Sequence, residues 1–270
     1  MPNVQKQVAV LVVSCDRYSD LWKPFFQMFR RFWPECQFPV YLLSNQRAMD
    51  FPGVTSLVIG SDPSWSDSLK MGLECIPEKY VLLFIDDLFL VKPVDNQRVL
   101  RIFEWMVSAG ANHVRMNAGP LPDKPFNDLV GVASPGTIYR TSTVMSVWKK
   151  SLLMELLKAG ESAWDFEIFG TERSDAHSGF YASWKKCFPV VNGVIKGKWQ
   201  RCAVKLLQSL GADLDLGQRG VVSRREMIKL QILQWRSNLL TWLVPAAYRR
   251  RFKHWLLRGR YNYRLVAKKN

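Results

Sequence analysis

Tyr80-Val-Leu-Leu-Phe-Ile-Asp-Asp-Leu-Phe-Leu-Val91 is an apolar run interrupted by two adjacent carboxylates, Asp86 and Asp87. A β-branched and aromatic run of this length predicts a strand buried on both faces, as in parallel sheets covered by helices. Successive strand residues point to opposite faces, so one carboxylate would enter the core unless the strand ends at the pair. We therefore expect the pair at the carboxyl edge of a sheet, where open α/β sheets bind ligands.

Strand and helix patterns alternate along the chain around this run. Strands are expected over residues 8–14, 40–44, 54–59 and 136–140, with a short one within 190–198. Helices are expected over 19–33, 66–75, 96–109, 142–159 and 163–169, and a Pro/Gly-rich loop over 117–134. This succession predicts an α/β fold with a mostly parallel, Rossmann-like sheet flanked by helices.

The basic residues are concentrated at the C-terminal end. The chain carries a net charge of +15, and residues 218–270 hold 14 of the 38 Lys and Arg residues but one of the 23 acids. Residues 1–217 are therefore nearly neutral, which disfavours a nucleic-acid partner, while 218–270 form a basic tail suited to a polyanionic partner. We expect one globular domain over 1–217 and an appended tail over 218–270.

The tail has the composition of an amphipathic helix that lies on a membrane surface. Between residues 227 and 253, Trp, Leu and Ile alternate with Lys and Arg. This pattern fits an anionic leaflet, although a helix that packs its apolar side on the body is the alternative. No signal peptide and no apolar run of about 18 residues is found. We expect a cytoplasmic protein, peripheral on the inner face of the cytoplasmic membrane.

A set of short motifs resembles bacterial glycosyltransferases of the GT-A type, which build surface polysaccharides such as lipopolysaccharide and capsule. The matching segments are Ser14-Cys-Asp-Arg-Tyr18, Leu42-Leu-Ser-Asn45, Trp65-Ser66, Ile85-Asp-Asp-Leu-Phe89, Gly160-Glu-Ser-Ala-Trp-Asp-Phe-Glu167 and Lys196-Gly-Lys-Trp199. The resemblance covers roughly residues 8–200 and not the tail, and it implies that the domain expected over 1–217 is GT-A-like. It also implies a nucleotide-sugar donor and a glycan acceptor, which we expect to be lipid-linked.

The acidic pair is the expected metal and donor site. Clustered carboxylates suit a hard divalent cation, Mn²⁺ or Mg²⁺, that bridges protein and phosphate oxygens. In the family that this chain resembles, an Asp-x-Asp motif does this, whereas here the two acids are adjacent and Leu88 follows them. We assign Asp87 as the principal metal ligand, and Asp86 as a second ligand or a contact of the donor sugar or ribose.

The turn after the first strand and a late glycine turn are expected to complete the donor site. Asp16 can accept hydrogen bonds from a base or ribose, and Tyr18 can stack on the nucleotide. Lys196 and Lys198 flank Gly197, where lysine can approach phosphate oxygens as a point charge. Ordinary turn chemistry explains Asp16 equally well, and a solvated turn explains the lysines.

A general base for the acceptor hydroxyl is expected between Trp164 and Glu167. Asp165 lies three residues after Ser162, a capping-box spacing that explains it without catalysis. Glu167 has no such local explanation, so we assign Glu167 as the base and Asp165 as the second candidate.

Two other functions use the same features. A sugar nucleotidyltransferase could use the same carboxylates, although the Gly-rich, Lys/Arg-bearing loop typical of that class after the first strand is missing. The third interpretation is a non-catalytic scaffold, tethered to the membrane within a polysaccharide assembly complex.

Overall fold

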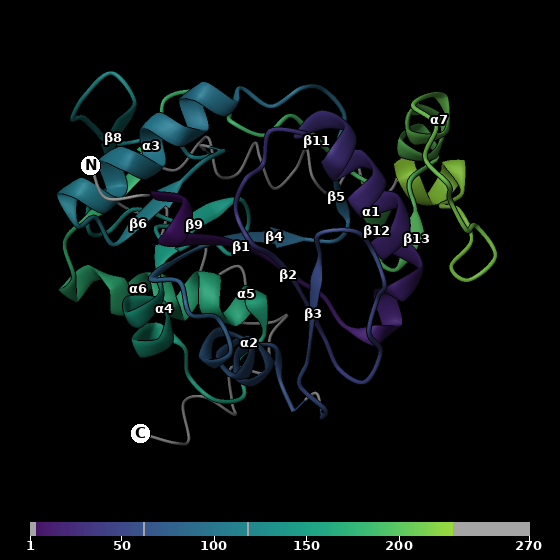
Figure 1. Ribbon diagram of the computed structural model, residues 1–270, viewed down its shortest axis with the longest axis horizontal. Coiled ribbons are helices and arrows are strands. Elements are labelled where there is room, and N and C mark those ends of the chain that lie inside the picture. The colour runs from purple at the N-terminus through teal and green to yellow at the C-terminus, as the bar shows by residue number, and fades with distance from the viewer. Residues whose placement is uncertain (1–3, 62, 118, 229–270) are drawn as a thin grey trace.

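The computed structural model describes residues 4–61, 63–117 and 119–228 of the 270-residue chain. Its centre is a nine-stranded sheet in the order β3-β2-β1-β4-β9-β6-β10-β8-β7 (Figure 1). The strands are β1 (Val8–Val13), β2 (Val40–Ser44), β3 (Thr55–Val58), β4 (Tyr80–Ile85), β6 (His113–Arg115), β7 (Lys124–Pro125), β8 (Val130–Val132), β9 (Ser146–Lys149) and β10 (Phe180–Ser183).

The N-terminal half of the sheet is parallel throughout. Strand β1 pairs in parallel with β2 and with β4, and β2 pairs in parallel with β3. Strand β9 runs antiparallel between β4 and β6, and β6 pairs in parallel with β10. The predicted α/β class with a sheet flanked by helices is confirmed.

Helices cover both faces of the sheet and create two hydrophobic cores (Figure 1). Helices α1 (Ser19–Phe32) and α3 (Asn96–Ala109) pack with Val8, Val10 and Val12 of β1. Helices α2 (Trp65–Glu74) and α4 (Lys150–Leu156) pack with Ala9 and Leu11, the alternate residues of the same strand. The double-sided burial explains why β1 and β4 are continuous apolar runs in the sequence.

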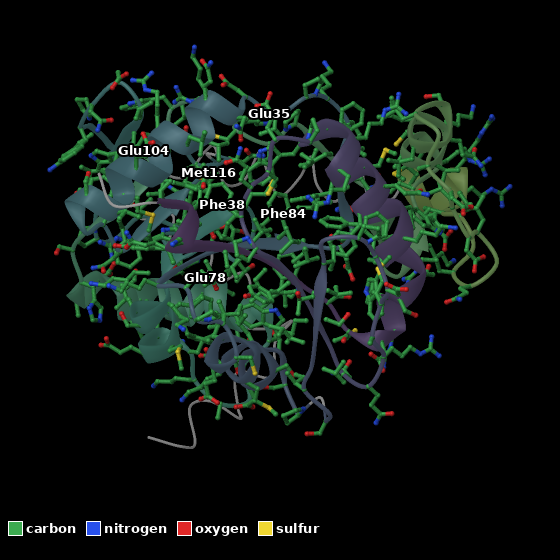
Figure 2. All side chains as sticks on the ribbon, in the orientation of Figure 1. Glu35, Phe38, Glu78, Phe84, Glu104 and Met116 are labelled. Atoms are coloured by element: carbon green, nitrogen blue, oxygen red, sulfur yellow. The ribbon has the colours of Figure 1, made fainter. Side chains whose placement is uncertain are left out.

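An aromatic cluster fixes α1 on its face of the sheet. The rings of Phe25 and Phe29 lie 6.2 Å and 5.8 Å from the ring of Phe84 on β4, and Phe84 lies 5.0 Å from Phe188. Figure 2 shows Phe84 deep inside the molecule, whereas Glu35 is at its surface. Edge-to-face pairs of this kind add to the burial of the rings and hold β4 in a fixed position.

The run over residues 80–91 is not one strand. Strand β4 ends at Ile85, Asp86 and Asp87 form a turn, and β5 (Leu88–Leu90) continues as one strand of a separate two-stranded sheet. Its partner is the antiparallel strand β11 (Val190–Asn192), with Asn192 opposite Leu88. The two carboxylates therefore lie at the carboxyl edge of β4, beyond the last residue of the strand, although both remain largely buried there.

Several other boundaries predicted from the sequence are wrong. The strand expected over 136–140 is a turn region in which Tyr139 has φ 52°, and the true strand is β9 at Ser146–Lys149. The helix expected over 142–159 is accordingly shorter, because α4 begins at Lys150. The expected loop over 117–134 contains β7 and β8, and the sequence did not indicate β6 or β10. Strands of two to four residues are too short to show an alternating pattern.

The segments around the predicted site follow the expectations more closely. A helix begins at Ala163 as predicted, with α5 (Ala163–Asp165), a π-helical turn (Phe166–Gly170) and α6 (Thr171–Arg173). Strands β12 (Val194–Ile195) and β13 (Lys198–Trp199) form a hairpin around Lys196 and Gly197. Helix α7 (Arg201–Ser209) follows them.

The first residues of the basic tail contact the body. Val222 is buried, and Val221 forms a parallel bridge with Trp199. The chain is helical at 224–228, and the remainder of the amphipathic helix predicted for the tail lies outside the described residues. Within the described ranges, no helix has the length and apolar character needed to cross a membrane.

Candidate functional site at the carboxyl edge of the sheet

Asp86 lies beside the turn that follows β1. Strands β1 and β4 are parallel neighbours with Val13 opposite Ile85, so Ser14 and Asp86 leave the sheet side by side. The Ser14 hydroxyl donates a hydrogen bond to Asp86 Oδ2 and accepts one at 2.7 Å from the indole Nε1 of Trp22. Asp86 is 5% exposed. The register of the sheet thus brings the turn after β1 next to the end of β4, the two segments that the sequence assigned to the donor site.

Asp87 is the less satisfied of the two acids. Its Oδ1 atom is buried and has no hydrogen-bond partner among the described residues, while its backbone carbonyl accepts from Gly193 N at 2.7 Å. A buried carboxylate oxygen without a partner is costly, and in a native structure it calls for a cation, a water molecule or a ligand.

Burial perturbs both carboxyl groups. It raises the pKa of Asp86 to about 8; the bond from Ser14 opposes this shift and the neighbouring charge of Asp87 adds to it. Burial also raises the pKa of Asp87 to about 6, against the effects of a backbone hydrogen bond and Arg219. Pairs of perturbed acids are characteristic of functional sites, because ordinary packing would avoid the cost.

The folded protein should lose stability as the pH rises, and Asp86→Asn should reduce this loss. The folded state holds the Asp86 proton up to a pKa of about 8, whereas the ordinary value is 3.8. The folded state therefore binds more protons between these values, and the free energy of unfolding falls as the pH rises through this interval. Asparagine keeps an oxygen for the Ser14 bond but carries no charge. Thermal unfolding from pH 5 to 9 should show that the free energy of unfolding of the variant rises relative to that of the wild type, by up to a few kcal/mol. The same pH dependence in both proteins would contradict the raised pKa of Asp86.

Tyr18 and Asp20 lie where the turn after β1 leads into α1. Tyr18 ends a short 3₁₀ helix (Asp16–Tyr18), and the guanidinium of Arg219 lies 4.5 Å from its ring centre. Burial raises the pKa of Tyr18, the Arg219 charge lowers it, and Asp86 and Asp87 raise it further, so Tyr18 is within electrostatic range of the acidic pair. The sequence did not identify Asp20 or Arg219 as site residues. They are 199 positions apart, and no local pattern links them.

Asp16 joins two strand ends. Its carboxylate accepts from the backbone N–H groups of Asn45, Gln46 and Arg47 at 3.0–3.2 Å, in the turn after β2. In return, Asn45 Oδ1 accepts from Asp16 N at 3.1 Å. These bonds occupy the carboxylate that was expected to bind the nucleotide, and they give Asp16 a role in shaping the edge of the site.

The hairpin turn with the two lysines follows Gly193, whose N–H binds the Asp87 carbonyl, and it contacts the start of the tail. Lys196 and Gly197 both have positive φ, 50° and 77°. Lys198 Nζ lies 2.9 Å from Glu226, and both side chains are half exposed. Lys198 is therefore paired with the start of the tail, whereas Lys196 stands at the tip of the turn.

Glu167 also reaches the carboxyl edge of the sheet. Its Oε1 accepts from the backbone N and the hydroxyl of Thr143, at 3.1 Å and 3.0 Å. Thr143 precedes β9, and β9 is antiparallel to β4 with Ser146 opposite Leu83, so this segment lies at the end of β4 that carries Asp86. Burial raises the pKa of Glu167, and the two bonds from Thr143 oppose the shift.

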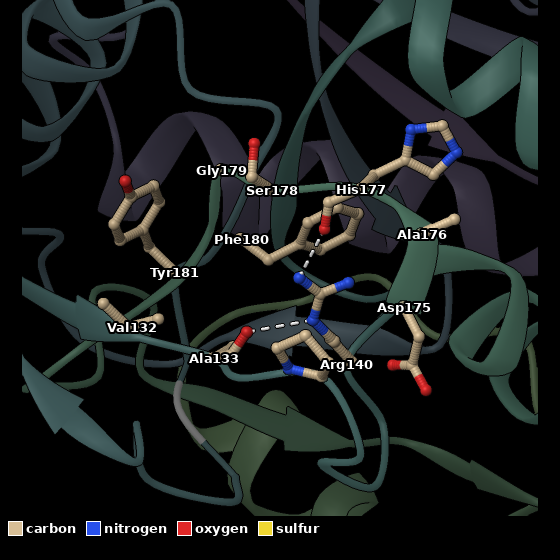
Figure 3. A pocket seen from close by; sticks show the side chains of 11 residues that line it. Val132, Ala133, Arg140, Asp175, Ala176, His177, Ser178, Gly179, Phe180 and Tyr181 are labelled. Atoms are coloured by element: carbon tan, nitrogen blue, oxygen red, sulfur yellow. Dashed lines mark hydrogen bonds between the residues drawn. The ribbon is translucent and has the colours of Figure 1, made fainter.

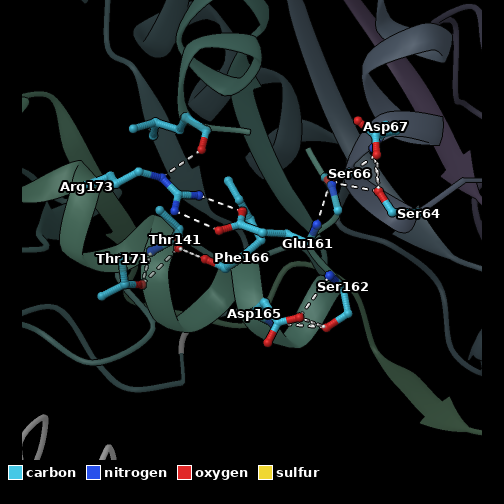
Figure 4. Close-up of polar contacts among 12 residues, drawn as sticks. Ser64, Ser66, Asp67, Thr141, Glu161, Ser162, Asp165, Phe166, Thr171 and Arg173 are labelled. Atoms are coloured by element: carbon cyan, nitrogen blue, oxygen red, sulfur yellow. Dashed lines mark hydrogen bonds and ion pairs between the residues drawn. The ribbon is translucent and has the colours of Figure 1, made fainter. Parts of the chain in front are cut away.

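Asp165 forms the capping box that its spacing predicts. Its Oδ2 accepts from the backbone N and the hydroxyl of Ser162, at 3.0 Å and 2.6 Å, and the Ser162 hydroxyl accepts from Asp165 N (Figure 4). The local explanation for Asp165 is confirmed.

A buried ion pair joins the two ends of the segment that carries Glu167, and backbone bonds of Glu161 hold the segment on α2. Arg173 binds both oxygens of Glu161 at 2.7–2.8 Å, and the Glu161 carboxylate is 3% exposed (Figure 4). Ser66 on α2 exchanges hydrogen bonds with the backbone of Glu161. Removing one member of a buried pair typically costs about 3–5 kcal/mol, so the pair fixes the segment that carries Glu167. In the sequence Glu161 stood out only through the resemblance.

The acids present can hold a metal only together with other ligands. No group of three or more His, Cys, Asp or Glu side chains arranged to bind a metal occurs in the ranges described. Mg²⁺ commonly takes one or two protein carboxylates and completes its octahedron with waters and substrate phosphates. Asp86 and Asp87, with the unpartnered Asp87 Oδ1, fit this type of site.

A cavity of about 450 Å³ lies at the other edge of the sheet (Figure 3). Its walls come from Val132, Ala133 and Pro135, from residues 175–181 at the amino end of β10, and from the buried Arg140. The Arg140 guanidinium lies 3.9 Å from the Phe180 ring centre. It includes none of the residues predicted for the site. The candidate site is therefore defined by its side chains and by the strand ends, not by this cavity.

Comparisons with known proteins do not assign a family. No family model matches the sequence, and a search of curated proteins gives no match. Among solved structures the chain is similar to S. aureus TarS, at 12% identity and a TM-score of 0.38 over 65% of this chain and 36% of that one. It is also similar to the bifunctional IspDF from Campylobacter jejuni, at 14% identity and a TM-score of 0.41 over 67% of this chain and 52% of that one. A 4-diphosphocytidyl-2C-methyl-D-erythritol synthase matches at 10% identity and a TM-score of 0.44 over 76% of this chain and 99% of that one.

Proposed function

We propose that the protein is a glycosyltransferase that moves a sugar from a nucleotide-sugar donor to a hydroxyl of a glycan. The observation that carries the proposal is the acidic pair at the carboxyl end of β4, beside the β1 turn, where Asp87 Oδ1 is buried and has no partner in the part of the chain that the structure describes. Ligands of open α/β sheets bind at this edge. The resemblance of the sequence motifs to GT-A enzymes indicates that the donor is a nucleotide sugar.

The donor would lie between the acidic pair and the turn that carries Tyr18. Asp87 would hold a divalent cation that faces the diphosphate, Asp86 would be a second ligand or contact the ribose or the donor sugar, and Tyr18 would supply a ring for the nucleotide base. Lys196, at the tip of its turn, can approach phosphate oxygens. A divalent cation, when bound by Asp86 and Asp87, supplies positive charge against the negative charge that develops on the leaving diphosphate.

Glu167 is the proposed base. Its Oε1 is held by Thr143, which fixes the orientation of the carboxylate, and we assign Oε2 to the acceptor hydroxyl. The raised pKa brings Glu167 nearer to neutral pH, where a carboxylate accepts a proton more effectively. Asp165 is the weaker candidate because Ser162 already engages it.

A donor screen tests this proposal. Purified protein would be heated with a panel of nucleotide sugars, with and without Mn²⁺, and stabilising donors would be assayed for release of a nucleoside diphosphate or monophosphate. Turnover of a nucleoside triphosphate and a sugar phosphate to pyrophosphate would instead support the nucleotidyltransferase. Stabilisation by neither set of ligands would favour the non-catalytic scaffold.

We further propose that the acceptor is a lipid-linked surface glycan and that the tail holds the enzyme at the anionic inner face of the cytoplasmic membrane. A truncation after Val222 keeps the contacts that residues 219–222 make with the body. Deleting residues 223–270 should move the protein from the membrane fraction to the soluble fraction. Salt should release the full-length protein in the same way, because screening weakens the attraction of Lys and Arg to anionic lipids. If the truncated protein stays with the membranes, the tail model is wrong.

A further inference from the structure

Arg219 contacts two segments around the candidate site, residues 17–20 and the hairpin turn at Gly197. Its Nε and Nη2 atoms bind both oxygens of Asp20 at 2.6 Å and 2.5 Å, and the Asp20 side chain is fully buried. Nη2 also donates to the Arg17 carbonyl at 2.9 Å, and Nη1 lies 3.5 Å from the carbonyl oxygen of Gly197. The guanidinium lies over the ring of Tyr18.

Backbone hydrogen bonds to Trp199 hold the segment that carries Arg219. Trp199 N donates to the Gly220 carbonyl at 3.0 Å, and Val222 N donates to the Trp199 carbonyl at 2.8 Å. Trp199 is itself fully buried against Phe89 of β5, with ring centres 5.7 Å apart. The segment that carries Arg219 is thus anchored to the strand that directly follows Asp87.

We propose that Arg219 is a positioning residue of the donor site, which clamps the turn that carries Tyr18 against the hairpin that carries Lys196. The two segments approach the acidic pair from opposite ends of the sequence, and in the described ranges Arg219 contacts both of them through its guanidinium. This inference rests on the proposed donor site and adds a residue from the start of the tail to it.

Arginine is required for this task on physical grounds. A planar guanidinium can bind a carboxylate with two parallel bonds, stack on an aromatic ring and still direct donors to a carbonyl. A lysine in the same place would keep the positive charge beside the buried Asp20. It would offer one compact ammonium, which cannot make the paired bonds to Asp20 and the bond to Arg17 in one plane.

The test compares full-length Arg219→Lys with the wild type. Binding of uridine, guanosine and thymidine diphosphates is measured by calorimetry with Mn²⁺, and kcat and KM are measured for the donor that turns over. We expect Kd and donor KM to rise about tenfold or more, with kcat at saturating donor changed by less than about threefold. Lys205→Ala, in which an exposed cation of α7 is removed, is the matched control and should bind as the wild type does.

A second, doubly substituted variant distinguishes a loss of nucleotide affinity from a loss of the fold. Asp20→Asn with Arg219→Gln replaces the ion pair by a neutral hydrogen-bonding pair, so no buried charge is left alone. It should melt close to the wild-type temperature and show the same loss of affinity for nucleotide. Wild-type affinity in either folded variant would overturn the role of Arg219. A wild-type protein that binds none of the nucleotides would instead remove the donor site itself, and the inference with it.

Discussion

Asp87→Ala is expected to abolish measurable turnover while the protein remains folded. The carboxylate is buried at the end of β4, one of its oxygens has no partner among the described residues, and we propose that it holds a cation near the leaving diphosphate. A carboxylate cannot itself stabilise a negative leaving group, so the expected loss is that of the cation it would hold. Removing one preorganised group that stabilises charge in a transition state typically lowers kcat by about 10²- to 10³-fold, and loss of a cation can lower it further. Release of the nucleoside phosphate from the donor found in the screen measures the effect.

The stability of the Asp87→Ala variant provides an independent check. Burial raises the pKa of Asp87, so the folded protein holds this charge at a cost, and removing it should leave the melting temperature unchanged or higher. Asp128→Ala is the control, since Asp128 forms an exposed ion pair with Arg101 and such pairs contribute little. An active Asp87→Ala enzyme, with normal Mn²⁺ dependence, would remove Asp87 from the site.

Glu167→Gln is expected to lower kcat by about 10²- to 10⁴-fold, the range typical of a lost general base. Glutamine can still accept both bonds from Thr143 through its Oε1, so the loop before β9 should keep its position. Nucleotide affinity, measured by calorimetry, should therefore stay near the wild-type value. This combination distinguishes loss of a base from loss of the site.

Asp165→Asn is the matched comparison for Glu167→Gln. It changes the other acid of the same segment, where the carboxylate serves the capping box. Asparagine keeps an oxygen that can accept from Ser162 and leaves the Ser162 N-cap intact, so the variant should lose less than about 1 kcal/mol of stability and kcat should be nearly unchanged. If instead Asp165→Asn is the slow variant and Glu167→Gln the active one, the roles of the two acids are reversed.

The sequence identified the central acidic pair through a contradiction between local signals. A strand buried on both faces cannot contain two carboxylates, so Asp86 and Asp87 had to mark its end, and β4 ends at Ile85. The same physical reasoning failed for β9, because its four residues carry no period and the preceding turn depends on the left-handed conformation of Tyr139. A long apolar run predicts a strand from the sequence alone. A strand of a few residues forms because neighbouring strands pair with it, so its sequence does not predict it.

The candidate site was predictable only in part. Asp86, Asp87 and Tyr18 lie within electrostatic range of one another, as expected for one site. Asp16 accepts hydrogen bonds from the turn after β2, and Lys198 forms an ion pair with Glu226. Both charges therefore have partners within the protein, and these partners are far from them in the sequence. Ser14, Asp20, Thr143 and Arg219 became visible only through contacts between segments distant in the sequence.

By itself, the sequence determined the alternation of strands and helices, the double-sided burial of β1 and β4, and the place at which charge must leave the core. These follow from hydrophobic period and from the cost of burying a carboxylate, which are properties of local residues. The tertiary structure alone decided which strand ends meet, that Thr143 orients Glu167, and that Arg219 reaches back to Asp20. Such pairings depend on the register of the sheet and on contacts between residues as many as 199 positions apart, which no local sequence pattern encodes.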